Sequence, residues 1–309
     1  MSRTTILHIV LTFITGSLIG TSFVLTKLLL GEGIGQIGLA FVQLAGASAL
    51  LLTVLWFRNA MPRWNGALLR YFFAASLIAL AAGPLLGAWV LGRIPAAVFT
   101  VVVTFSPMFT TLLTALIERR LPSAKAMAGV LLGLTGVLLV LLPRIRVAPD
   151  EEALALWFAL GVPLLLAIGN VYRSRYWPPQ LGAPAASAGG LAMQSLLLIP
   201  LLATTPRVGM VALFGSASLL AALVLVTVAA NVAGSTLQRV AGATAYSQIG
   251  YVIALTGVVA GAVIFDERLD AMFWPALVLV FAGIVLNNSA QKSARPVSAV
   301  SPILSRSNT

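Results

Sequence analysis

The sequence contains no cysteine, a single histidine (His8) and few charged residues, 9% of the total. The absence of thiols excludes disulfides and cysteine chemistry, and one histidine is too few for a His/Cys metal cluster. No spacing of Asp, Glu, His or Ser supplies a nucleophile with its base, so we expect a protein that is not an enzyme. We accordingly expect no cofactor, no metal ion and no catalytic residues.

The sequence is rich in long runs of apolar residues. Hydrophobic residues make up 60% of the chain and the mean hydropathy is +1.02, whereas roughly a quarter of the residues of a soluble globular protein are charged. In lipid, a long apolar chain can form all its backbone hydrogen bonds as a helix. The composition therefore predicts an all-α integral membrane protein that lies in the lipid bilayer. The first run, Ile6 to Leu30, can cross about 30 Å of hydrocarbon. It lacks a small-residue cleavage site, so we interpret it as an uncleaved span.

Ten apolar runs are bounded by charged or turn residues, which predicts ten transmembrane helices with short connections. They cover approximately Ile6 to Leu30, Gly33 to Phe57, Ala67 to Leu91, Pro95 to Ile117, Ala126 to Leu142, Leu154 to Tyr172, Ala183 to Leu202, Val211 to Thr236, Ala243 to Phe265 and Met272 to Asn287. The Ser-rich residues 289–309 are predicted to form a disordered cytoplasmic tail.

One stretch of the sequence occurs twice, at residues 97–121 and 245–269. Each copy is an apolar run of membrane length that ends in an acid-x-Arg-Leu motif. We take the copies as the fourth spans of two homologous halves. Five spans per half is an odd number, so the second half must enter the membrane in the opposite orientation. The sequence therefore predicts ten transmembrane helices arranged as two inverted five-helix repeats, residues 1–148 and 149–288.

Weaker matches extend the repeat beyond the fourth spans. GTSFVLTK at residues 20–27 aligns with GNVYRSRY at residues 169–176, which pairs Thr21 with Asn170. The second and seventh spans align so that Gln43 meets Gln194. These pairs place polar side chains at equivalent positions of the two halves.

The distribution of charge predicts the orientation of the chain. If the N-terminus is cytoplasmic, most of the nineteen basic residues fall on the cytoplasmic side, and of the eight acids only Glu118 does. Both termini are therefore predicted to be cytoplasmic. The net charge of +11 is scattered over short loops, so membrane topology and anionic lipid account for it and no nucleic-acid partner is expected.

Three segments resemble a known family: GTSFVLTK in the first span, ERRLPSAKAMAGVLLGLTGVLLV across the fourth and fifth, and DERLDAMFWPALVLVFAGIVL across the ninth and tenth. They are similar to EamA-type members of the drug/metabolite transporter superfamily, which are ten-span permeases built from two inverted repeats. The resemblance covers residues 5–288. It implies a multi-pass secondary transporter of the bacterial inner membrane that exports amino acids or related small metabolites by alternating access around a central cavity.

The sequence departs from that family at two places. Ile19 stands where the family often has Trp, so an aromatic contact is missing or supplied elsewhere. Leu255 stands where Pro is common, whereas the fourth span keeps Pro107. Because proline interrupts a helix, we expect a kink in one half only.

Polar residues at depth in the fourth and ninth spans are candidate substrate-binding residues. Thr100 and Thr104 share one helix face with Pro107, and Gln248 and Tyr251 occupy the corresponding face of the ninth span. A polar group in hydrocarbon is costly and usually faces protein or a cavity. These side chains either line two alternating half-channels or bond a neighbouring helix or their own backbone.

Five further polar residues complete the predicted binding set. Gln43 and Gln194 lie near the middle of their spans, and their amides can bind a carboxylate or an ammonium group, or simply join helices. Asn231 belongs to a polar stripe in the eighth span and is favoured as a cavity group. Thr21 and Asn170 join the set as repeat mates, Asn170 lying closer to the cytoplasmic interface.

The sequence places no Asp or Glu deep inside any predicted span, and Lys27 and Arg93 are the only cations near a span end expected to reach inward. We therefore expect uniport or exchange, or coupling through another group, and a small-molecule substrate of balanced charge such as a zwitterionic amino acid. Efflux of drugs and a non-transporting lipid-binding or assembly role stay open as alternatives. A monomer is a plausible functional unit.

Overall fold

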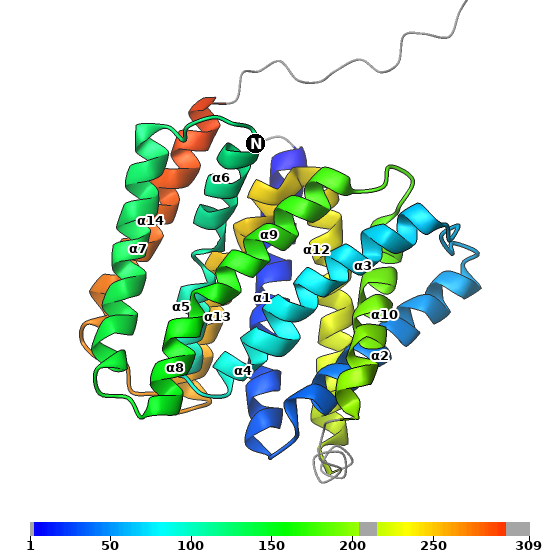
Figure 1. Ribbon diagram of the computed structural model, residues 1–309, viewed down its shortest axis with the longest axis horizontal. Helices are drawn as coiled ribbons and strands as arrows, with labels where there is room; N and C mark the ends of the chain where they lie inside the picture. The colour runs from blue at the N-terminus through cyan, green and yellow to red at the C-terminus, as the bar shows by residue number, and fades with distance from the viewer. Residues whose placement is uncertain (1–2, 204–214, 295–309) are drawn as a thin grey trace, which may run out of the picture.

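The computed structural model describes residues 3–203 and 215–294, and these residues form helices and short connections. The helices are α1 (Arg3–Gly31), α2 (Gln36–Phe57), α3 (Gly66–Leu80), the π-helix η1 (Ala81–Gly87), α4 (Ala88–Leu91), α5 (Ala96–Val103), α6 (Ser106–Ile117), α7 (Ala124–Ile145), α8 (Asp150–Ala159), α9 (Gly161–Tyr176), α10 (Ala183–Leu202), α12 (Ala217–Ser247), α13 (Ile249–Val263) and α14 (Phe273–Ala294). Figure 1 shows them as one bundle.

Eight helical segments are long and apolar enough to cross a membrane, and two more are apolar but shorter. The eight agree with the first eight predicted spans, except that the start of the eighth span, near Val211, lies outside the described residues. The two shorter helices are Ile249–Val263 and Phe273–Asn287, where we predicted the ninth and tenth spans. An all-helical, multi-pass membrane protein is thus confirmed.

The predicted ninth span, Ala243 to Phe265, is divided in the structure. Gly242 adopts φ 79° and ψ −179°, a conformation open mainly to glycine. Residues 243–247 are helical after this bend, Gln248 forms a turn, and α13 starts at Ile249. The ninth apolar helix is short because the chain bends twice before it begins.

The predicted fourth span is also divided, between α5 and α6. Pro107 has no N–H group, so the carbonyl of Val103 receives no helical hydrogen bond from it. The N–H of Phe105 donates to Val102 O at 3.0 Å, which is three residues back along the chain instead of the four of an α-helix. The predicted kink before Pro107 is present, and α13 continues through Leu255 without one. The prediction of a kink in one half only is nevertheless wrong, because the ninth segment breaks at Gln248.

The third predicted span contains a π-helix that the sequence did not lead us to expect. Pro84 lies inside η1, where it removes a donor and widens the helix. Gln36 Nε2 donates to Pro84 O at 2.8 Å and to Leu85 O at 2.6 Å. The side chain of Gln36 on α2 thus supplies a donor to two carbonyls of the widened turn.

Three pairs of helices that lie far apart in the sequence pack side by side. They are α2 with α10, α5 with α13, and α7 with α14; Figure 1 shows the last pair clearly. In the predicted numbering these are the second and seventh, fourth and ninth, and fifth and tenth spans. The doubled stretch of the sequence therefore packs against its own copy.

Small residues allow the closest of these contacts. A Cβ atom on Gly129 of α7 would lie 2.6 Å from both Asn287 N and Gly283 O of α14. In the same way, a Cβ atom on Gly136 would lie 2.7 Å from Ala276 O. The two backbones approach within a distance that only glycine permits at these positions.

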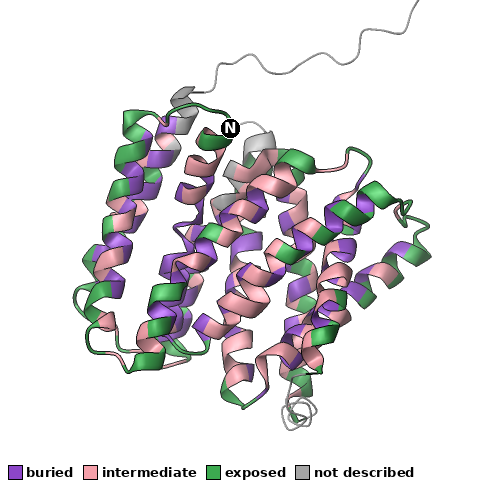
Figure 2. Cartoon of the chain, in the orientation of Figure 1, coloured by how far each residue is buried: buried purple, intermediate pink, exposed green. Residues whose placement is uncertain are grey.

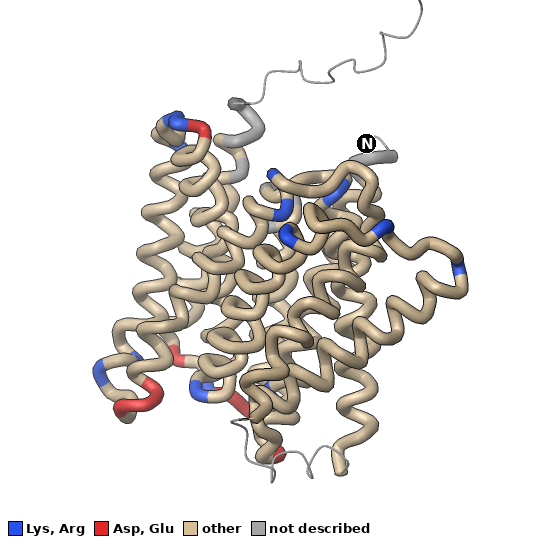
Figure 3. The backbone as a smooth tube through the Cα atoms, turned by 45° about the vertical axis from the view of Figure 1, so that its right-hand side comes forward, with Lys and Arg blue, Asp and Glu red and all other residues tan. Residues whose placement is uncertain are grey.

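The surface of the bundle fits a lipid surrounding. Large apolar side chains such as Leu77, Leu131 and Val259 are exposed along the helices, and Figure 2 shows exposed residues on the outer sides of the bundle. Charged residues gather at its two ends, with most acidic residues at the end opposite the N-terminus (Figure 3). Helix α14 continues to Ala294, so residues 289–294 of the predicted tail are helical, and 295–309 lie outside the described residues.

Candidate functional site

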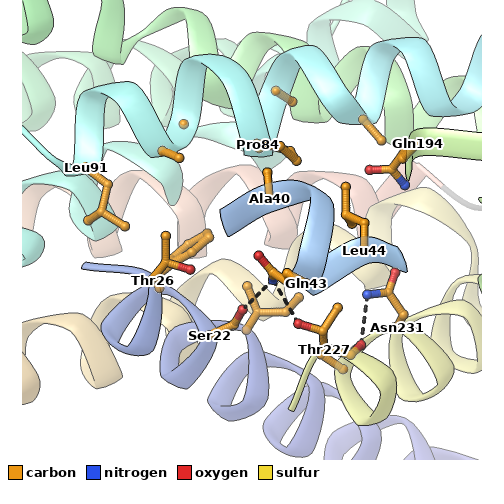
Figure 4. A pocket seen from close by; sticks show the side chains of 18 of the residues that line it. Ser22, Thr26, Ala40, Gln43, Leu44, Pro84, Leu91, Gln194, Thr227 and Asn231 are labelled. Atoms are coloured by element: carbon orange, nitrogen blue, oxygen red, sulfur yellow. Dashed lines mark hydrogen bonds between the residues drawn. The ribbon is translucent and has the colours of Figure 1, made fainter. Parts of the chain in front are cut away.

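A cavity of about 230 Å³ lies between helices of both predicted repeats. Its walls come from α1 to α5, including η1, in the first half and from α9, α10 and α12 in the second. Most of the lining is apolar, and Figure 4 shows the polar side chains reaching in from several helices. The polar and charged residues that line it are Ser22, Thr26, Gln36, Gln43, Arg173, Gln194, Thr227 and Asn231.

Gln43 connects the two halves across this cavity. Its Nε2 donates to Thr227 Oγ1 at 2.8 Å and to Ser22 Oγ at 3.4 Å (Figure 4). Thr227 is available as an acceptor because its own hydroxyl hydrogen goes to Leu223 O, one turn back on α12, at 2.7 Å. The bond between Gln43 and Thr227 is a direct polar link between α2 and α12.

Gln194 and Asn231 place two more amides at one end of the cavity (Figure 4). Gln194 Nε2 donates to Gly190 O at 3.3 Å, and Asn231 Nδ2 donates to Thr227 O at 2.9 Å. Each nitrogen is thus held by the backbone of its own helix. Within the described part of the chain no donor bonds the side-chain oxygen of Gln43, Gln194 or Asn231, so three acceptors remain for a ligand.

Arg173 of α9 is the charged cavity residue that the sequence did not predict; the polar lining residues Ser22, Thr26, Gln36 and Thr227 also lie outside the predicted binding set. Of the cations near span ends, only Lys27 and Arg93 were expected to reach inward. The structure corrects this: Arg173 is the one charged residue among the described residues that line the cavity. The available signal was the spacing of Arg173 from Asn170, which is one helical turn.

The guanidinium of Arg173 is held on two sides. Its Nη2 donates to Asn170 Oδ1 at 2.9 Å, and its Cζ lies 5.5 Å from the centre of the Tyr246 ring. Among the described residues, no hydrogen-bond partner meets its buried Nε, and no carboxylate forms an ion pair with it. Arg173 is therefore oriented without being neutralised.

Asn170 is buried beside the cavity and does not line it. Its side chain accepts the bond from Arg173, and its backbone carbonyl accepts a bond from Gln238 Nε2 at 2.9 Å. Gln238 also donates to Ser174 Oγ at 3.1 Å, which fixes α12 against this turn of α9. The structure thus places Asn170 as the support of Arg173.

Thr100 and Thr104 are buried between α5 and α13, away from the cavity. Thr100 donates to Ala96 O at 3.0 Å, and Thr104 donates to Val101 O at 2.5 Å. Thr100 packs directly on Gly257, and the Cα atom of Thr104 would lie 3.2 Å from a Cβ atom on Gly250. In this structure both hydroxyls bond their own helix, which was the second of the two interpretations.

The remaining three predicted site residues also lie outside this cavity. Tyr251 stacks on Phe281, with ring centres 5.7 Å apart. Gln248 is half-buried in the turn before α13. Thr21 faces an apolar groove between α1 and α13. The structure therefore brings Gln43, Gln194 and Asn231 together and does not bring the other predicted residues into the same space.

Lys27 lies near the C-terminal end of α1 and reaches inward as expected. Its Nζ lies 2.7 Å from Glu267 Oε1 and 3.0 Å from Ile94 O. The Glu267 carboxylate also accepts bonds from the N–H groups of Ala96 and Ala97 at 2.6 Å and 3.0 Å. A negative charge at the N-terminus of α5 is favourable, so the pair joins α1, α5 and the α13–α14 connection.

Within the described residues there is no group of three His, Asp or Glu side chains that could hold a metal ion. The acids near Lys27 and Arg120 are instead engaged in ion pairs, Glu267 with Lys27 and Glu118 with Arg120. The chemistry that the cavity offers is therefore recognition by amides, hydroxyls and one guanidinium.

Comparisons with known proteins agree with this architecture. Residues 6–142 match the model of the EamA-like transporter family, which confirms the resemblance to EamA-type permeases over the first half of the chain. A solved structure, titled only "Crystal structure of protein", shares the fold with a TM-score of 0.60 and 16% identity, over 88% of this chain and 98% of that one. A search of curated proteins finds no significant match.

Proposed function

We propose that this protein is a secondary transporter that exports amino acids or related small metabolites by alternating access around the cavity between two inverted repeats. The observation that carries the proposal is the hydrogen bond from Gln43 to Thr227, which crosses between the halves inside the cavity. Alternating access requires the halves to rock against each other around a fixed site. A polar link inside the cavity, which can exchange for bonds to water or to a substrate, is compatible with such motion.

The packing of equivalent helices supports the inverted repeat. A pseudo-two-fold axis in the membrane plane relates each helix to its mate, and mates close to the axis must contact each other. Helix α2 packs on α10, α5 on α13 and α7 on α14. The start of α1 and the end of α14 also lie at the same end of the bundle (Figure 1), as an even number of crossings requires.

The size and polarity of the cavity support a small zwitterionic substrate. Pockets for drug-sized ligands measure roughly 300 to 1,000 Å³, and this cavity measures about 230 Å³. Among its described lining residues there is no acid to attract a permanent cation. Amides can accept from an ammonium group and donate to a carboxylate, so small metabolites are favoured over cationic drugs.

The transport test is counterflow in proteoliposomes that contain the purified chain. Each of the twenty amino acids is offered as a labelled substrate against the same unlabelled amino acid inside. We expect exchange of at least one amino acid above the rate of empty liposomes. Absence of counterflow for all twenty would remove the amino-acid assignment, and absence of flux for any small metabolite would remove the transporter itself.

A lipid-binding role is the second candidate, and one observation favours it. An apolar groove runs between α1 and α13 and is lined by Phe13, Leu255 and Val259 among others. Leu255 and Val259 are exposed by more than half. Bound lipid that co-purifies with a transport-inactive protein would support this role over transport.

We further propose that both termini face the cytoplasm of a bacterial inner membrane. The N-terminal end of the bundle carries mostly Lys and Arg, and the opposite end carries most of the acids (Figure 3), which fits the positive-inside rule. Because the chain has no cysteine, single substitutions report topology without background. A membrane-impermeant thiol reagent added to whole cells should label Val147→Cys and spare Ala60→Cys; the reverse pattern would contradict this orientation.

A further inference from the structure

Arg173 lies where three cavities meet. It lines the main cavity and also two small ones of about 40 Å³ each, one toward α3 and α10 and one toward α1 and Tyr246. Asn231 lines all three as well, and Gln194 lines the main cavity and the first of the small ones. A cation and two amides are thus gathered around one connected space.

The cation in this space lacks a counter-charge. Arg173 is half-buried, and withdrawing a charged group from water is costly when no partner compensates it. The described ion pairs leave Arg173 out while engaging Lys27, Arg93, Arg120 and Arg144. The nearest compensation is one amide oxygen, from Asn170, and one aromatic face, from Tyr246. Its Nε is buried and has no partner among the described residues, and the only described hydrogen bond of the guanidinium is made by Nη2, so the outer end of the fork with Nη1 is available to a ligand.

We propose that Arg173 binds the carboxylate of the transported molecule, and that the side-chain oxygens of Asn231 and Gln194 receive its ammonium group. This inference rests on the proposed function and assigns the substrate class at its site, an α-amino monocarboxylic acid. The planar guanidinium matches the two oxygens of a carboxylate. The amide nitrogens of Asn231 and Gln194 are already bonded to their own helices, which presents the oxygens to a donor.

A single carboxylate matches the charge of the site better than a phosphate does. One arginine neutralises one negative charge, and no second cation lines the cavity within the described residues. A phosphate dianion would leave an uncompensated charge in an apolar enclosure. The amide oxygens would also have no donor to bind if the ligand lacked an ammonium group.

The test is binding by the purified full-length chain in detergent, with the melting temperature as the readout. The probes are the twenty L-amino acids, their carboxamides and inorganic phosphate. We expect at least one amino acid to raise the melting temperature of the wild type, whereas its carboxamide and phosphate do not, since only the acid supplies a single carboxylate.

The variants Arg173→Gln and Arg175→Gln form a matched pair, because Arg175 lies on the same helix but is exposed. Arg173→Gln should weaken the apparent affinity for the responding amino acid roughly 10- to 100-fold, which is the usual effect of losing a charged hydrogen bond. Arg175→Gln should respond as the wild type does. Arg173→Lys keeps the charge but loses the fork, so it should retain part of the response.

Four results would overturn the proposal: a carboxamide that stabilises as well as its acid, phosphate that stabilises in place of amino acids, a wild-type response in Arg173→Gln, or no response of the wild type to any amino acid. The comparison of acid and carboxamide uses the wild type alone, so it stands even if a variant fails to fold. Arg173-dependent binding without counterflow would refute transport and keep this site. Counterflow with an unchanged KM in Arg173→Gln would refute the site and keep transport.

Discussion

Two inward-reaching cations, Lys27 and Arg173, lie toward opposite ends of the bundle and have opposite surroundings. Lys27 meets a carboxylate, a backbone carbonyl and the Phe265 ring, and its carboxylate partner Glu267 is itself held by two N–H groups. Arg173 meets one neutral amide and one aromatic ring. A cation that is paired with a carboxylate of the protein holds helices together. A cation that has no counter-charge in the protein is free to bind a ligand. The contrast separates a structural site from the proposed binding site.

The largest expected effect on stability comes from breaking the ion pair of Lys27 with Glu267. Lys27→Met leaves the mostly buried Glu267 carboxylate without its cation, which should destabilise the protein by about 3 kcal/mol. Thermal unfolding of the purified protein without ligand should show a clear drop in melting temperature. The double variant Lys27→Met/Glu267→Gln should lose less than the single one, because no unpaired charge remains.

The matched control for Lys27 is the exposed pair of Arg93 with Glu151. Glu151 is 87% exposed, so Glu151→Gln should change the stability by no more than about 0.5 kcal/mol. An equal loss in Glu151→Gln and Lys27→Met would show that the Lys27 pair is an ordinary surface contact.

Arg173→Met should act in the opposite sense on stability. Because it removes a half-buried cation that has no counter-charge, the melting temperature without ligand should stay the same or rise. Counterflow of the carried amino acid should fall strongly in the same variant. A loss of stability comparable to that of Lys27→Met would mean that Arg173 holds the fold, and the contrast between the two sites would disappear.

Asn170→Ala should give a smaller effect, through Arg173. Losing the Oδ1 acceptor at 2.9 Å frees the guanidinium to move, so the KM for the carried amino acid should rise roughly 3- to 10-fold. The maximal rate should change less than the KM, because Asn170 does not line the cavity. Recovery of the wild-type KM in Asn170→Asp would be inconsistent with this role, since a carboxylate there would occupy Arg173.

Thr227→Val tests the link between the halves and should have only a small effect on stability. It removes the acceptor for Gln43 at nearly constant volume, at about 0.6 kcal/mol, the average for such bonds in membranes. The rate of counterflow should change because the bond must break as the halves move. An unchanged rate would indicate that this bond is not part of the moving seam.

The sequence predicted the helices well because apolar length and bounding charges follow directly from the needs of backbone groups in lipid. The prediction from apolar run length failed where a local bend or a π-helix interrupts the run. The bends at Gly242 and Gln248 shortened the ninth helix. The π-helix at Pro84 is bonded by Gln36, which lies far away in the sequence. Such compensation is visible only when the partners are in place.

The candidate site was predicted in part. Gln43, Gln194 and Asn231 line the cavity because amides at mid-span depth must face protein or a cavity. Thr100 and Thr104 satisfy the same polarity rule by bonding their own backbone, so depth alone could not distinguish them. Arg173 was missed because a basic residue near a span end usually faces water, and only its packing against Asn170 and Tyr246 shows that it turns inward.

The most direct test is an experimental structure of the chain with a carried amino acid bound. The account predicts density in the cavity between the halves, with the carboxylate within hydrogen-bond distance of Arg173 and the ammonium group near Asn231. Density for the amino acid in the groove between α1 and α13, with the cavity beside Arg173 empty, would contradict it.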